Sequence, residues 1–113
     1  MHEMALAESM LEIVETTARK NGAQRVLSVR LEIGALASVE AEALRFCFDA
    51  VTRGSLADRA RLEIETTPGA AWCMACADTV PVPALGAPCP HCGGYQLAVS
   101  QGDAMRVKDI EVA

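Results

Sequence analysis

The sequence predicts an α+β fold, in which two helices pack on a small three-stranded sheet and a cysteine-rich segment is inserted between the second and third strands. Three observations lead to this prediction. Two stretches place apolar residues at the three- and four-residue spacing of a helix face, and three others alternate apolar and polar residues as strands do. Residues 69–101 show neither period and hold four of the five cysteines. With 113 residues, the chain can bury one conventional core but not two.

The first predicted helix runs from Met4 to Asn21, and the first strand follows it. Arg19 and Lys20 fall in the last helical turn, where cations oppose the negative end of the helix dipole, and Gly22 suits a left-handed cap. The apolar face of this helix consists of Leu6, Met10, Ile13, Val14 and Thr17. The strand ends at Gly34 and buries Leu27, Val29, Leu31 and Ile33.

A second helix and a second strand follow in the same order. Ser38 is the expected N-cap, with Glu40 and Glu42 near the positive end of the helix dipole. The strand covers 61–67, with Leu62 inward. The apolar face of the helix consists of Leu44, Cys47, Phe48 and Val51, so Cys47 is expected to be a buried, inert thiol.

The regular pattern resumes after the cysteine-rich segment in a third strand that begins at Met105. Its apolar positions change from odd to even numbers across Lys108 and Asp109, which indicates a bulge or a change of the buried face. The expected domains are therefore an α+β domain formed by 1–68 and 102–113, and a cysteine domain formed by 69–101.

The cysteine spacing predicts a metal site. Cys73 and Cys76 form one Cys-x-x-Cys turn, Cys89 and Cys92 form a second, and twelve residues separate them. Four thiolates suit tetrahedral Zn²⁺ and close its coordination sphere, so the zinc would be structural and residues 69–101 would form a rubredoxin-like zinc-ribbon domain. Iron uses the same four ligands and remains an alternative. We expect the flanking aromatic residues, Trp72 and Tyr95, to cover this site or to pack at the domain junction.

Charge and composition exclude several functions. Ten Lys and Arg against fifteen Asp and Glu leave a net charge of −5, and Asp78 is the only charged residue between Ala70 and Leu97. A ribbon without cations releases no counterions, so we expect no nucleic-acid partner. We find no secretory signal and no run of about 18 apolar residues, which predicts a cytoplasmic protein without a membrane partner. No catalytic constellation or phosphate-binding loop is present, so we expect no enzyme activity.

The amino terminus carries the second chemical feature. Met1-His2-Glu3 places an amine, backbone amides and an imidazole within one short stretch, and such nitrogen ligands favour square-planar Ni²⁺ or Cu²⁺. A solvated, frayed terminus is the alternative interpretation.

Five motifs together resemble one family over essentially the whole chain. They are Met1-His2-Glu3-Met4, Leu31-Glu32-Ile33-Gly34, the run 42–48, the run Cys89-Pro90-His91-Cys92-Gly93-Gly94 and the tail 102–112. In these motifs the chain resembles the HypA/HybF family of hydrogenase nickel-incorporation proteins. The resemblance implies a nickel metallochaperone that delivers Ni²⁺ to the large subunit of NiFe-hydrogenase, with the accessory GTPase HypB as a partner.

The same resemblance implies which residues hold each metal. Nickel is assigned to the Met1 amine, to the His2 side chain and amide, and to Glu3, while structural Zn²⁺ is assigned to the four cysteines. Glu40 stands where the family suggests an acidic residue as a candidate additional nickel ligand, and an acid in the first turn of a helix is the equal alternative. His91 is either an alternative metal ligand or an exposed side chain.

Several questions stay open at the level of sequence. The competing hypothesis is a zinc-ribbon adaptor in transcription or RNA processing, with no nickel role. Which hydrogenase is served, whether urease maturation is also supported, and whether the protein is a monomer or a homodimer do not follow from the sequence.

Overall fold

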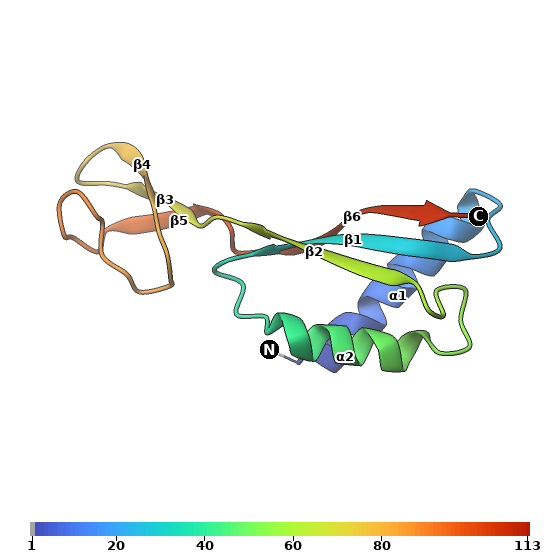
Figure 1. The fold of residues 1–113 in the computed structure, drawn as a ribbon. Coiled ribbons are helices and arrows are strands. Elements are labelled where there is room, and N and C mark those ends of the chain that lie inside the picture. Colours follow the sequence, from blue (N-terminus) through green and yellow to red (C-terminus); the bar gives the residue numbers. More distant parts are fainter. Residues whose placement is uncertain (1) are drawn as a thin grey trace. The chain divides into compact units, whose positions relative to one another are not determined.

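The computed structural model describes residues 2–113, which fold into two helices and two three-stranded sheets, in agreement with the predicted fold class. One sheet has the strand order β2-β1-β6 and the other β4-β3-β5 (Figure 1). In chain order the elements are α1 (Glu3–Lys20), β1 (Val26–Gly34), α2 (Ala41–Thr52), β2 (Arg61–Thr67), β3 (Ala70–Cys73), β4 (Asp78–Pro81), β5 (Leu97–Gln101) and β6 (Met105–Val112).

The chain divides into two compact units. Unit 1 comprises Met1–Leu31, Val39–Glu65 and Arg106–Ala113, and contains both helices. Unit 2 comprises Glu32–Ser38 and Thr66–Met105, and contains the β4-β3-β5 sheet with all four paired cysteines. Within residues 2–113, no helix is both long enough and apolar enough to cross a membrane.

The core of unit 1 lies between the helices and one face of the sheet (Figure 1). Alternation along β1 is confirmed, since Val29, Leu31 and Ile33 are buried, although Leu27 is exposed near the strand start. The predicted apolar face of α1 is only partly correct. Met10 and Val14 are buried, but Ile13 is 53% exposed, and the helix buries Ala7 and Ala18, which the prediction did not include. The buried residues of α1 are Ala7, Met10, Val14 and Ala18, and those of α2 are Leu44, Phe48 and Thr52.

The start of α2 differs from the prediction. Ser38 is not the N-cap, because its backbone is left-handed, with φ of 56°, whereas an N-cap needs an extended conformation. Glu40 takes this role: its carboxylate accepts hydrogen bonds from the backbone N–H groups of Glu42, at 3.3 Å, and Ala43, at 2.6 Å. Cys47 is half-buried rather than buried.

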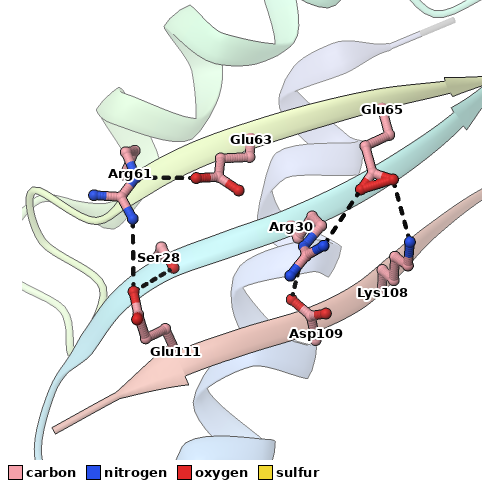
Figure 2. A network of polar contacts seen from close by, with 8 residues as sticks. All are labelled: Ser28, Arg30, Arg61, Glu63, Glu65, Lys108, Asp109 and Glu111. Atoms are coloured by element: carbon pink, nitrogen blue, oxygen red, sulfur yellow. Dashed lines mark hydrogen bonds and ion pairs between the residues drawn. The ribbon is translucent and has the colours of Figure 1, made fainter.

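The outer face of the first sheet is charged. Figure 2 shows Arg30 of the central strand between Glu65 of β2, at 3.7 Å, and Asp109 of β6, at 3.2 Å. Lys108 also reaches Glu65, at 3.2 Å. Lys108 and Asp109 are both exposed, which confirms the predicted change of the buried face in β6. Each of these exposed ion pairs contributes little to stability, but together they show that this face of the sheet is exposed to solvent.

Unit 2 has a small core of its own. Its central strand, β3, pairs antiparallel with β4 and β5, and Trp72 lies opposite Thr79 on one side and Ala98 on the other. One member of the core, Leu36, comes from the segment that follows β1, far from the cysteines in sequence. The core consists of Leu36, Ala71, Cys73, Val80, Val82 and Cys89.

Two glycines of unit 2 are in direct backbone contact. The Gly102 carbonyl accepts a hydrogen bond from the Leu36 N–H, at 2.7 Å, and Gly34 donates to the Ala104 carbonyl, at 2.8 Å. A Cβ atom at Gly34 would overlap the carbonyl group of Gly102, so no side chain fits there. The glycines therefore let two chain segments cross where a larger residue would separate them.

Candidate metal centre

The fold brings the four predicted cysteines together. Cys73 is the last residue of β3, Cys76 lies in the turn before β4, and Cys89 and Cys92 lie in the loop between β4 and β5. All four Sγ atoms lie within 4.8 Å of one another. Within residues 2–113, this is the one group of three or more His, Cys, Asp or Glu side chains placed to hold a metal ion.

The distances between the sulfurs fit a tetrahedral metal site. A Zn–S bond of about 2.3 Å requires neighbouring sulfurs to be about 3.8 Å apart. Cys73 Sγ lies 3.7 Å from Cys92 Sγ, and Cys76 Sγ lies 3.9 Å from Cys89 Sγ. None of these cysteines is in a disulfide, and each of the two close pairs joins one Cys-x-x-Cys turn to the other. The arrangement therefore suits one shared ion and not two independent redox pairs.

The backbone of both turns supports the sulfurs. Cys73 Sγ accepts a hydrogen bond from the Cys76 N–H at 3.5 Å, and Cys89 Sγ accepts one from the His91 N–H at 3.4 Å. The residue after the second cysteine is left-handed in each turn, Ala77 with φ of 52° and Gly93 with φ of 73°. Glycine adopts this conformation without strain, whereas an alanine carries no signal for it, so the role of Ala77 could not be recognised from the sequence.

Two of the thiols differ in proton affinity. Hydrogen bonds from the backbone N–H groups of Cys92 and His91 lower the pKa of Cys89 to about 6. Hydrogen bonding to the sulfurs of Cys92 and Cys73, together with burial, raises the pKa of Cys76 to about 12. A metal ion that binds all four sulfurs must therefore displace a proton from Cys76.

The cluster is closed by its own ligands. Four thiolates leave no open coordination position for water, so a zinc ion here would be structural. The side chain of His91 is exposed, and the four sulfurs complete a tetrahedron without it. Trp72 and Tyr95, the flanking aromatic residues, are 46% and 71% exposed, so neither is buried.

The amino terminus has a different geometry. Met1 lies outside the described residues. His2 is exposed, is the N-cap of α1, and has an extended backbone, with φ of −89° and ψ of 95°. The first N–H groups of a helix have no acceptor within the helix, so the nitrogens of His2 and Glu3 can bind a metal without breaking the helical hydrogen-bond ladder.

A contact across the chain ties this terminus to α2. The Glu3 carboxylate accepts a hydrogen bond from the backbone N–H of Glu40 at 3.3 Å. Since the Glu40 carboxylate caps α2, both acids lie at the start of that helix. Sequence reasoning raised Glu3 and Glu40 separately, but the 37 residues between them hid the contact.

The fold and the four-sulfur site together define a small metal-binding protein that joins an α+β unit to a zinc-ribbon unit. A family model described as "Hydrogenase/urease nickel incorporation, metallochaperone, hypA" matches residues 1–112. The chain belongs to the HypA family. This match favours nickel incorporation over the zinc-ribbon adaptor, and it places the chain among metallochaperones and maturation factors, which are not known as enzymes.

Individual relatives agree with the family match. The chain is 60% identical to the hydrogenase maturation factor HypA of Albidiferax ferrireducens and 59% identical to that of Rhodopseudomonas palustris, over 99% of each chain. The solution structure of the Ni metallochaperone HypA from Helicobacter pylori is similar, with a TM-score of 0.73 and 25% identity, over 99% of this chain and 97% of that one. The family and the four-cysteine cluster agree with the predicted cofactors, structural Zn²⁺ and transported Ni²⁺.

Proposed function

We propose that this chain carries Ni²⁺ at its amino terminus and delivers it to the large subunit of NiFe-hydrogenase during maturation, with the GTPase HypB as a partner. The family description, nickel incorporation into hydrogenase or urease, supports this function. The ligands are the imidazole and backbone nitrogen of His2, with the Met1 amine and Glu3. We place this function in the cytoplasm, as the sequence predicts.

One observation carries the proposal: α1 begins at Glu3, and His2 precedes it with an exposed imidazole. The backbone nitrogens at this point have no helical acceptor, so a nickel ion can draw on them and on the imidazole together. Such a site is open to solvent and depends on protonatable nitrogens. A carrier needs both properties, because it must release its ion to the next protein.

The zinc ion has a separate, resident role. We assign it to Cys73, Cys76, Cys89 and Cys92, in a zinc-binding domain of residues 69–101. The nickel-binding α+β domain consists of 1–68 and 102–113. With its coordination sphere closed by thiolates, the zinc stabilises the ribbon and takes no part in nickel transfer.

Calorimetric titration of Ni²⁺ into the zinc-loaded full chain tests the nickel site. His2→Ala should lose the terminal binding event, whereas His91→Ala, which alters the only other histidine, should keep it. One residue added before Met1 should also weaken binding, because it moves the amine out of chelating position. Equal affinity and stoichiometry in wild type and His2→Ala would remove the terminal site.

Delivery needs its own experiment. A host that lacks its own HypA, and that makes NiFe-hydrogenase, should regain nickel in the large subunit with the wild-type chain but not with His2→Ala. Co-purification with HypB is measured for both, so that a loss of hydrogenase nickel can be separated from a loss of the partner. Restoration of hydrogenase nickel by His2→Ala would separate maturation from the proposed nickel ligand.

A further inference from the structure

Unpartnered cations gather at one end of unit 1. Most cations in residues 2–113 have a hydrogen bond or an ion pair, including Arg30 and Arg61 on the outer sheet face. Within residues 2–113, four cationic side chains have neither a hydrogen bond nor an ion pair. They are Lys20, Arg25, Arg53 and Arg59.

Four separate segments bring these cations to the same end. Lys20 ends α1, Arg25 precedes β1, and Arg53 directly follows α2. Arg59 lies in the loop that connects α2 to β2. In Figure 1 these segments lie together, at the end of unit 1 that also holds the C-terminus. A chain with a net charge of −5 therefore concentrates unpaired positive charge in one place.

Three of these four residues line two neighbouring hollows, which have Asp58 and Arg59 in common. The first hollow, of about 450 Å³, is bordered by Arg25 and Arg59, and also by Glu15 and Arg19, which form an ion pair with each other. The second, of about 540 Å³, is bordered by Arg53 and again by Arg59. Asp58 lines both hollows, but one of its carboxylate oxygens already accepts a hydrogen bond from the Gly54 N–H at 3.2 Å.

Helix dipoles explain only part of this arrangement. Lys20 and Arg53 stand at helix C-termini, where a cation is favourable without any ligand. Arg25 and Arg59 have no such explanation. Arg59 has φ of 64°, a left-handed conformation that favours glycine or asparagine, and yet an arginine occupies this position, where it lines both hollows.

An exposed aromatic ring extends this surface along α2. Phe46 is 74% exposed, the highest value among the exposed large apolar side chains. It lies three residues before Asp49, which lines the second hollow, so Phe46 and Asp49 share one side of α2, and this helix ends directly before Arg53. Aromatic residues and arginine are the side chains most enriched at the centres of protein interfaces.

We propose that Phe46, Arg53, Arg59 and Arg25 form a docking surface, the Arg–Phe surface, for an acidic segment of a partner protein that also carries an apolar residue. Carboxylates pair with guanidinium groups through two parallel hydrogen bonds, and the apolar residue packs on Phe46. A nucleic acid fits less well, because Asp58 and Asp49 divide the positive surface into separate arginines, which suits individual carboxylates better than a continuous phosphate backbone. The proposal does not depend on nickel.

The test uses fluorescent peptides and the zinc-loaded full chain. The probe is an acidic peptide with a Glu-Glu-Leu repeat, compared with a Glu-Glu-Ser peptide and with a single-stranded oligonucleotide of equal charge. We expect the Glu-Glu-Leu peptide to bind best, to shift the amide signals around residues 25, 46, 53 and 59, and to weaken with added salt.

Variants locate the surface. Arg25→Gln with Arg59→Gln, and separately Phe46→Ser, should each weaken binding by about fivefold or more. Arg61→Gln is the matched control, because Arg61 is paired on the outer sheet face, and it should leave affinity unchanged. Circular dichroism confirms that each variant is folded. Three results would overturn the proposal: no peptide binding at millimolar concentration, equal weakening by Arg61→Gln, or tighter binding of the oligonucleotide.

Discussion

At the scale of single residues, Glu40 joins two features that the sequence kept apart. Its carboxylate caps α2, while its backbone N–H holds the Glu3 carboxylate beside the proposed nickel ligand His2. The resemblance to the family raised Glu40 as a nickel ligand. The structure provides a complete structural role for it, because both of its carboxylate oxygens already accept backbone hydrogen bonds.

Two substitutions of Glu40 separate these roles. Glu40→Ala should destabilise the protein by about 1 kcal/mol through loss of the cap. Glu40→Gln keeps one oxygen that can accept from the backbone, so it should lose less stability and keep nickel affinity. Urea denaturation and nickel titration of both variants provide the measurement. A large loss of nickel affinity in the folded Glu40→Gln variant would instead make Glu40 a ligand.

At the scale of elements, β1 ends where two glycines pass each other. Gly34 is the last residue of β1, and Gly102 lies between β5 and β6. The backbone hydrogen bonds of Leu36 and Gly34 hold this crossing, which also places Leu36 in the core beside Cys73 and Cys89. The small core of unit 2 therefore depends on close packing of the backbone as well as on metal ligands.

Gly34→Ala should destabilise unit 2 by about 2 kcal/mol or more, because the new methyl group would overlap the Gly102 carbonyl. Gly22→Ala is the control: Gly22 has φ of 66°, and a methyl group added there would have no atom within 4 Å. This change therefore reports the cost of positive φ alone, about 1 kcal/mol. Denaturant unfolding compares the two. A smaller loss for Gly34→Ala than for Gly22→Ala would contradict the steric argument.

At the scale of the whole molecule, the two units depend on different forces. Unit 1 buries large side chains such as Met10, Leu44 and Phe48 between helices and sheet. The core of unit 2 is made of few and mostly small side chains, and two of them are cysteines of the metal site. Small units of this kind commonly need a metal ion to remain folded.

Removal of zinc should therefore affect the units unequally. A strong chelator, or Cys73→Ser, should collapse the amide signals of residues 70–101 while the helical signal of α1 and α2 persists. Zinc should also leave on acidification, because protons compete with the metal ion for the four thiolates. A unit 2 that keeps its dispersed spectrum without zinc would show that the metal is not structural.

Local sequence patterns were enough to predict many of the structural elements of this protein. The period of α1, the alternation in β1, the bounds of β2 and the spacing of the cysteines all act over a few residues, so each could be recognised before any fold was known. Only the tertiary structure decided which side of α1 is buried, how Leu36 enters the core of unit 2, and that Glu3 meets Glu40. These contacts join residues that are distant in the chain. Their energies depend on how closely the backbone segments approach one another, and a periodic pattern within one segment holds no information about that distance.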